Sequence, residues 1–394
     1  YGDHRDLHSF PTRRSSDLKA KTILITFAVL TFSLTACSSS SKNLDNRPLS
    51  SIRISGDSLH RLSKNTDIRP VSIVEEKDYE DDSDKNVERT LKLKDFHGVS
   101  VNSSVDIHYT QGNTYKVVAK SNEYGFETTE ISVKDGLLTC LKKGRDKNNG
   151  SNNKVILYIT APKMNVIKND GRTSFYASAF TVDDMEINNK GVLHVKVESM
   201  KYSNFRIDNS GWLEIKGSYN GGTTDYSNSG VCNITADFNG GNVNYRNNGH
   251  TEFNGSVKGG AMDYSNFGVC KMKVDFDVAD MKYENTGHSE FTGKVNTGRM
   301  IFTNMGVTND KLDVEAESMS IAVTGHSNGN VNFKGQSMDI TCNGIMEMKF
   351  DVDCDKLTSA NTGRITLEVS GRADDTEFSG SGISDIKTEG LNKF

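Results

Sequence analysis

Residues 249–267 read GHTEFNGSVKGGAMDYSNF, residues 268–286 read GVCKMKVDFDVADMKYENT, and residues 287–305 read GHSEFTGKVNTGRMIFTNM. The three segments are equal in length, and each begins with glycine. The pattern extends in both directions, with a glycine spacing of 20 for the first two intervals and 19 for the other nine. The glycines are Gly171, Gly191, Gly211, Gly230, Gly249, Gly268, Gly287, Gly306, Gly325, Gly344, Gly363 and Gly382. A fixed short period over more than half of a chain is typical of a solenoid, in which each repeat stacks on its neighbours.

Within each repeat the apolar residues alternate with polar ones. After Gly268, for example, Cys270, Met272, Val274 and Phe276 are separated by polar residues. A period of two predicts a half-buried β-strand rather than a helix. A second strand is predicted before the next glycine, because apolar residues recur six and four positions ahead of it. Each repeat is therefore expected to form one coil with two strands.

Asparagine recurs two positions before most of the glycines, starting with Asn169. The later members that define a predicted ladder are Asn189, Asn209, Asn228, Asn247, Asn266, Asn285, Asn304 and Asn361. Strand parity points these amides inward, where a buried amide requires hydrogen bonds, and stacked amides can supply them to one another. The following glycine is expected to allow positive φ at this corner. The alternative is that these are ordinary turn asparagines that face water.

The repeats predict an all-β fold, a right-handed parallel β-helix (β-solenoid) with coils of about 19 residues and a length of roughly 50 Å. Alternate repeats resemble each other more than neighbours do, so a coil made of two repeats remains the alternative. In coils made of one repeat, inward-facing Cys232 and Cys270 lie two rungs apart, about 10 Å, too far for a disulfide. Asp310 falls on an inward position with Gly329 one repeat later, which predicts an irregular coil there.

The first part of the chain has a different character. Residues 1–18 resemble a translated sequencing adapter and are interpreted as an artefact. Residues 19–36 combine lysines, a short apolar run and the sequence Leu-Thr-Ala before Cys37, which resembles a lipoprotein signal peptide. That resemblance implies a lipid on the Cys37 thiol and placement at the outer membrane. Residues 37–88 are rich in serine, asparagine and acidic residues, which predicts a flexible acidic tether.

Residues 89–170 are rich in predicted strands but lack the regular period, and we expect an irregular strand cap before the repeats at 171–394. The stretch ERTLKLKDFHGVSVNSSVDIHYTQGNTYKVVAKSN, which starts at Glu88, contains an acid-Phe-x-Gly-Val step, a Val-x-Ile strand and Gln-Gly before a valine-rich strand. These features resemble the auto-transporter adhesin family with a head GIN domain, which is common in Bacteroidetes lipoproteins. The resemblance spans about Arg89 to Gly382. It implies a right-handed β-helix outside a bacterial cell, and it carries over no catalytic motif.

Individual residues give weaker signals. Trp212, the only tryptophan, sits on an outward position and is the candidate ligand contact, for example with a sugar. His250, His288 and His326 share an outward position two rungs apart, too far apart to bind one metal ion, so no metal or cofactor is predicted. The remaining cysteines are odd in number, lie at core positions, and are interpreted as buried apolar groups. They are Cys140, Cys232, Cys270, Cys342 and Cys354.

The net charge of −5 and the absence of a basic stripe argue against a nucleic-acid partner. Outward charges are scattered and the strict period leaves no room for inserted loops that would build a catalytic cleft. The sequence therefore predicts a non-enzymatic, lipid-anchored envelope protein that binds a glycan or a surface protein as an adhesin does. The alternatives are a structural or assembly lipoprotein facing the periplasm and, less favoured, a polysaccharide-active β-helix enzyme.

Overall fold

The computed structural model describes residues 86–144 and 154–392. The chain divides into two units, residues 1–76 and 77–394, and all described elements belong to the second. The predictions for residues 1–18, residues 19–36 and Cys37, and nearly all of the predicted tether, lie outside the described residues. The first described strand begins at Val87.

The N-terminal part of the second unit combines antiparallel and parallel pairs. Its elements are β1 (Val87–Leu91), β2 (Gly98–Val101), β3 (Ser104–Gln111), β4 (Lys116–Ser121), α1 (Glu123–Thr128), β5 (Thr129–Lys134), β6 (Leu137–Lys142), β7 (Val155–Ala161), β8 (Val166–Asn169) and β9 (Arg172–Thr181). Strands β1, β4 and β7 pair antiparallel, as do β5 and β6. Strand β3 already pairs in parallel with β7 and β9, and β2 with β6 and β8. Parallel stacking therefore begins before Gly171.

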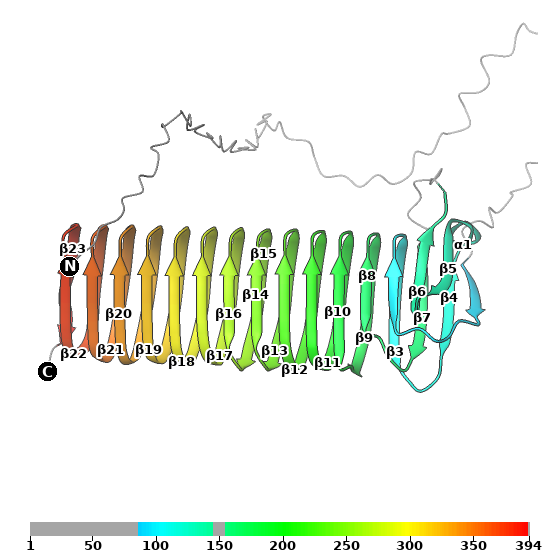
Figure 1. The fold of residues 1–394 in the computed structure, drawn as a ribbon, viewed down its shortest axis with the longest axis horizontal. Coiled ribbons are helices and arrows are strands. Elements are labelled where there is room, and N and C mark those ends of the chain that lie inside the picture. The colour runs from blue at the N-terminus through cyan, green and yellow to red at the C-terminus, as the bar shows by residue number, and fades with distance from the viewer. Residues whose placement is uncertain (1–85, 145–153, 393–394) are drawn as a thin grey trace, which may run out of the picture. The chain divides into compact units, whose positions relative to one another are not determined.

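The repeats form a parallel β-helix whose coils stack along one axis (Figure 1). Its strands are β10 (Asp184–Asn189), β11 (Val192–Asn209), β12 (Trp212–Asn228), β13 (Val231–Gly240), β14 (Val243–Asn247), β15 (His250–Gly259), β16 (Met262–Asn266), β17 (Val269–Asn285), β18 (His288–Asn304), β19 (Val307–Val323), β20 (His326–Cys342), β21 (Ile345–Asn361), β22 (Arg364–Gly380) and β23 (Ile383–Asn392). Val269 pairs with His250 on one side and with His288 on the other. Each coil is therefore made of one repeat and not of two.

Most coils contain one long bent strand, where two strands per coil were predicted. Strand β17, for example, runs without interruption from Val269 to Asn285. The coils that begin at Gly171, Gly230 and Gly249 are divided, into β9 and β10, into β13 and β14, and into β15 and β16. Gly240 and Gly259, both with positive φ, end β13 and β15. Elsewhere the backbone bends without leaving the parallel ladder.

A bulge marks the step from the longer, earliest coils to the shorter ones that follow. Val197 pairs with Gly217 and Ser199 pairs with Ser218, so Glu198 has no partner in the next coil. One extra residue in one strand is the defining feature of a β-bulge. The coil absorbs it without changing which side chains face inward, because Leu193 and Ile207 are both fully buried on either side of it.

The asparagine ladder is present and buried. From Asn169 to Asn304, each side-chain Nδ2 donates to Oδ1 of the asparagine one coil later, at 2.7–2.9 Å. The ladder ends where Val323 replaces asparagine, and Asn304 donates instead to the hydroxyl of Ser327 at 2.8 Å. Asn361 is buried but does not belong to the ladder, because Cys342 and Gly380 occupy its position in the adjacent coils. Its amide donates to Ser359.

The corner glycines are required for close stacking and not for positive φ, which corrects the sequence-based explanation. None of the twelve is among the glycines with φ in the left-handed region. A Cβ on Gly287 would lie 2.0 Å from the carbonyl oxygen of Gly268, and a Cβ on Gly306 would lie 2.0 Å from that of Gly287. Successive corners therefore pack backbone against backbone, which only glycine allows.

Asp310 lies inside a regular coil, so the predicted irregularity is wrong. It pairs in register with Phe291 and Gly329, and it is 1% exposed. Neither carboxyl oxygen is in hydrogen-bonding geometry with a donor. Burial raises the pKa of Asp310 to about 7. The regular stack therefore holds an acidic side chain in its core, at a cost in free energy.

Candidate binding surface

Aromatic side chains gather on the outward face of the first parallel coils. Tyr158 on β7, His108 on β3 and Tyr176 on β9 occupy matching positions in adjacent strands. The His108 ring stacks on both tyrosine rings, with centroids 5.0 Å apart in each pair. Tyr158 is 46% exposed and Tyr176 is 36% exposed. Because strand alternation sends Leu157 and Phe175 into the core, these tyrosines point outward.

Trp212 lies on the same outward side, two coils beyond Tyr176 and four positions earlier along the strand. It begins β12 and packs against His194 of β11, with ring centroids 4.7 Å apart. Trp212 is half-buried, which corrects the expectation of an exposed indole, because His194 covers part of it. We call the five residues Tyr158, His108, Tyr176, His194 and Trp212 the aromatic platform.

Charged groups border the aromatic platform and orient its histidine. His194 Nδ1 lies 2.7 Å from a carboxyl oxygen of Glu214, and Lys216 Nζ lies 2.6 Å from the other oxygen. The hydrogen bond from Lys216, followed by that from His194, lowers the pKa of Glu214. Glu214 thus remains a carboxylate that accepts the Nδ1–H of His194. On the opposite border Lys154 pairs with Asp106 at 2.5 Å.

The platform has the chemistry of a binding surface. Tyrosine and tryptophan present apolar ring surface together with a hydroxyl or N–H that can hydrogen-bond, and such residues are enriched where proteins bind partners. The rings are fixed on strands, so little conformational entropy is lost when a ligand packs on them. The sequence reasoning found Trp212 but missed Tyr158, His108 and Tyr176, because these precede or open the regular repeats. The signal was present as outward aromatic residues in the alternating stretches DIHY, ILYI and SFYA.

A second outward surface is a shallow groove of about 440 Å³ on the later coils. Its charged lining residues are Lys294, Asp313, Glu315, Lys334, Asp351 and Asp353. The outward charges are scattered along the sequence, but the fold collects these six, because they recur seven and nine positions after the corner glycine. We call this surface the charged groove.

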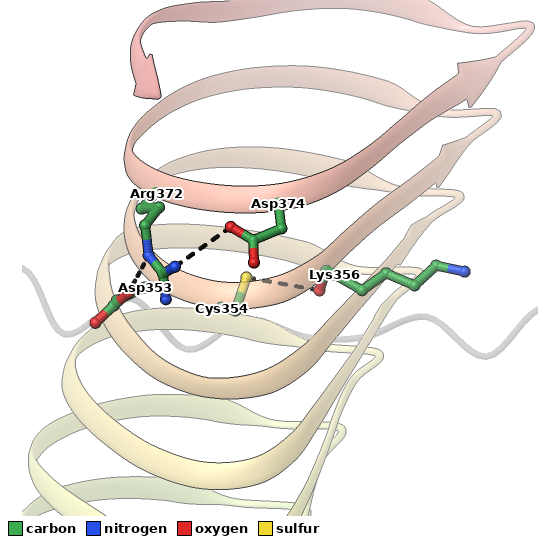
Figure 2. Close-up of polar contacts among 5 residues, drawn as sticks. All are labelled: Asp353, Cys354, Lys356, Arg372 and Asp374. Carbon is green, nitrogen blue, oxygen red and sulfur yellow. Dashed lines mark hydrogen bonds and ion pairs between the residues drawn. The ribbon is translucent and has the colours of Figure 1, made fainter. Parts of the chain in front are cut away.

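Three of the four carboxylates of the charged groove, Asp313, Asp351 and Asp353, are engaged by side chains of the next coil. Asp313 accepts a hydrogen bond from Asn332 at 2.6 Å. Figure 2 shows Arg372 of β22 between Asp353 on the preceding coil and Asp374, at 2.8 Å and 3.3 Å, while the Lys356 side chain extends away from them. Cys354 lies beneath this group and donates to the Lys356 carbonyl at 3.6 Å. The Asn332–Asp313 and Arg372–Asp353 contacts join successive coils, which is a structural role.

The remaining predicted positions do not form a site. His250, His288 and His326 are separated by Val269 and Val307 along the stack. Among residues 86–144 and 154–392, no three His, Cys, Asp or Glu side chains are arranged to hold a metal ion. Cys232 and Cys270 both pair with Thr251 and so lie two rungs apart, and burial raises the pKa of each thiol to about 12. In the same described residues, no helix is long and apolar enough to cross a membrane.

Several solved structures are similar to this chain at low sequence identity. They include a putative adhesin from Bacteroides fragilis NCTC 9343, with 15% identity over 78% of this chain and 98% of that chain, at a TM-score of 0.29. A putative adhesin from Parabacteroides merdae ATCC 43184 has 14% identity over 74% and 96%, at a TM-score of 0.28. A putative lipid binding protein from Parabacteroides distasonis ATCC 8503 has 14% identity over 77% and 96%, at a TM-score of 0.26.

Among curated proteins, no sequence matches this chain. A family model does match: residues 95–258 fit the family described as "Putative auto-transporter adhesin, head GIN domain". The matched region is shorter than the stretch from Arg89 to Gly382 on which the resemblance was drawn. It contains the whole aromatic platform and the first half of the asparagine ladder. Residues 95–258 are therefore similar to the family described as putative auto-transporter adhesin, head GIN domain.

Proposed function

We propose that this chain is a non-catalytic, adhesin-like binding protein of the bacterial cell envelope. The observation that carries the proposal is the aromatic platform, in which His108 stacks between two exposed tyrosines and, on later coils of the same outward side, His194 packs on Trp212. The family whose model matches residues 95–258 supports adhesion as the activity. The ligand class that suits the platform is a glycan, whose apolar ring faces pack on aromatic side chains while its hydroxyls bond to tyrosine, histidine and the bordering charges.

The proposal includes a lipid anchor on Cys37 and exposure at the outer membrane. Both rest on the signal-peptide pattern of residues 19–36, and a tether over residues 37–88 would give the β-helix reach. The competing placement is the periplasmic face, where the same scaffold would serve in assembly or structure. A polysaccharide-cleaving activity would use the charged groove, but three of its four carboxylates are engaged by side chains of neighbouring coils.

Binding is tested with the purified chain on a panel of immobilised glycans and matrix proteins. We expect retention on at least one glycan, and at least a tenfold loss of affinity in the variant Tyr158→Ala/Tyr176→Ala. The matched control is Thr235→Ala/Thr292→Ala, which shortens side chains at the position that Tyr176 occupies but on later coils. Equal binding by both double variants would place the contact elsewhere. Absence of binding by the unmodified chain to every panel member would refute the proposed function.

Placement is tested by surface labelling of intact cells that express the tagged protein, with and without permeabilisation of the outer membrane. We expect labelling of intact cells, and loss of membrane association in the variant Cys37→Ser. Labelling only after permeabilisation would instead favour the periplasmic role.

A further inference from the structure

Exposed apolar residues flank the corner glycines of alternate coils. The residues directly before and directly after the corner glycine, over the seven coils from Gly230 to Gly344, are called the corner stripe. Its exposed apolar members and their exposures are Val231 39%, Phe267 53%, Val269 42%, Met305 54%, Val307 44% and Ile345 40%. Exposed apolar side chains that recur along one edge make that edge a candidate interaction surface.

The rungs between these residues are polar but uncharged. His250, His288 and His326 occupy the position after the glycine, with Asn248, Thr286 and Thr324 before it. With histidine counted as neutral, none of the residues in the corner stripe carries a formal charge. The columns next to it do carry charge, for example at Glu252 and Lys271. The residues of the stripe thus form an uncharged track about 29 Å long from Val231 to Ile345 at the usual spacing between strands. The Arg246 guanidinium lies over the Phe267 ring, 5.9 Å from its centroid.

The order of residues in the corner stripe is symmetric about the coil of Gly287. One coil away on either side are Phe267 and Met305, each followed across its glycine by a valine. Two coils away on either side are His250 and His326, and three coils away are Val231 and Ile345. The stripe therefore has the same chemical order when it is read from either end. A surface with this property is complementary to its own copy turned by a two-fold axis.

We propose that two copies of this chain associate side by side and antiparallel through the corner stripe. The two-fold axis passes beside Gly287, so that Phe267 of each copy packs on Met305 of the other. Val269 then faces Val307, and Val231 faces Ile345, so apolar rungs meet apolar rungs throughout.

A second copy fits this surface better than an unrelated partner for two reasons. The chain carries a net charge of −5, so two copies approach most easily along an uncharged track. An unrelated partner would not require a symmetric order of residues. In a two-fold symmetric pair, each rung of one copy contacts a rung of the same character on the other. The contact is long but narrow, so the association should be weak in free solution, as is usual for interfaces of small area.

The antiparallel arrangement is tested by cysteine cross-linking in a Cys37→Ser background, with full chains that carry one new cysteine each. Mixing Phe267→Cys chains with Met305→Cys chains should give a disulfide-linked heterodimer under mild oxidation. Each of these chains alone should give little homodimer, because equivalent residues lie two rungs apart, about 10 Å. Thr286→Cys alone should cross-link to itself, because this residue lies beside the axis. Homodimers of Phe267→Cys as abundant as the heterodimer, or no cross-linking at all, would overturn the proposal.

Sedimentation velocity on the uncross-linked chain supplies an independent measurement. The variant Phe267→Ser/Met305→Ser should raise the dimer dissociation constant at least tenfold, with an unchanged circular dichroism spectrum because both residues are more than half exposed. This inference does not depend on the proposed function. The variant Tyr158→Ala/Tyr176→Ala should leave self-association intact, and the stripe variant should leave panel binding intact, so each proposal fails separately. A wild-type chain that stays monomeric at every concentration would contradict self-association.

Discussion

At the scale of single residues, the ladder asparagines satisfy buried polar groups in a repeating way. Asn247 accepts from Asn228, donates to Asn266 and also donates to the Val269 carbonyl. Asn361 is equally buried but bonds only to Ser359, and its Oδ1 has no partner. The two residues therefore form a natural comparison between an amide in the ladder and one outside it.

We predict that Asn247→Ala lowers the free energy of unfolding by about 2–4 kcal/mol, because buried partners on both adjacent coils lose a hydrogen bond. Asn361→Ala should have a clearly smaller effect. Denaturant unfolding followed by circular dichroism checks both variants. Equal losses for the two would mean that the ladder bonds contribute little beyond side-chain packing.

The corner glycines give a second prediction at this scale. Gly287→Ala places a methyl group 2.0 Å from the Gly268 carbonyl oxygen, which forces the backbone to shift and should lower stability by about 2–3 kcal/mol. Gly298→Ala is the matched control on the same coil, since its Cβ would meet only the Ala279 carbonyl oxygen at 3.1 Å. Thermal melting of the two variants should separate them clearly. A tolerated Gly287→Ala would show that the corners have room to move apart.

Asp310 gives a prediction about pH. Burial raises the pKa of Asp310 from 3.8 to about 7 in the folded chain. Between these values the folded state holds a proton that the unfolded state releases, so stability falls as pH rises through this window. The loss in the free energy of unfolding approaches about 4 kcal/mol and is complete above the pKa of Asp310 in the folded chain.

In Asp310→Asn this loss should be absent, so the variant should gain stability relative to wild type as pH rises from 4 to 8. Unfolding midpoints of both chains across this range test whether the stability difference grows with pH, because all other groups titrate in both chains. A difference between the chains that does not change with pH would show that Asp310 is not protonated in the folded state.

At the scale of the element, the coil length and its inward face could be predicted from the sequence. The inward positions around Cys270, Met272 and Phe276 follow from strand parity alone. Other features could not be predicted, because they depend on contacts between coils. The spacing shows that a coil has an extra residue, but not that Glu198 is the one left unpaired. Likewise, inward position alone did not show that Asn361 lacks a ladder neighbour, which required the register of the flanking coils.

The element scale also yields a prediction about coil deletion. Removal of residues 249–286, two full coils, should preserve the fold, because Asn247 then stacks on Asn304 and the alternation of repeats continues. Removal of residues 249–285 leaves one extra residue, which shifts the strand by one position and turns core side chains outward unless a bulge absorbs it. Thermal melting should show a cooperative transition for the first deletion and a markedly lower midpoint for the second. Equal midpoints would mean that register between coils is loosely specified.

At the scale of the whole molecule, the β-helix is a rigid scaffold that carries separate surfaces. The aromatic platform lies on the first parallel strands, the charged groove on the later coils, and the corner stripe along one edge. The platform was only partly predictable, because its tyrosines lie in strands where the period is not yet regular. Trp212 could be singled out because it is the only tryptophan and sits on an outward position. Its contact with His194 depends on how adjacent coils align.

The single tryptophan allows the central claim to be measured directly. We would follow Trp212 fluorescence while each glycan of the panel is added to the purified chain, with binding measured in parallel by calorimetry. If the aromatic platform is the binding surface, glycans that bind should change the Trp212 emission with saturation at the calorimetric affinity. A glycan that binds by calorimetry yet leaves Trp212 emission unchanged would contradict the account.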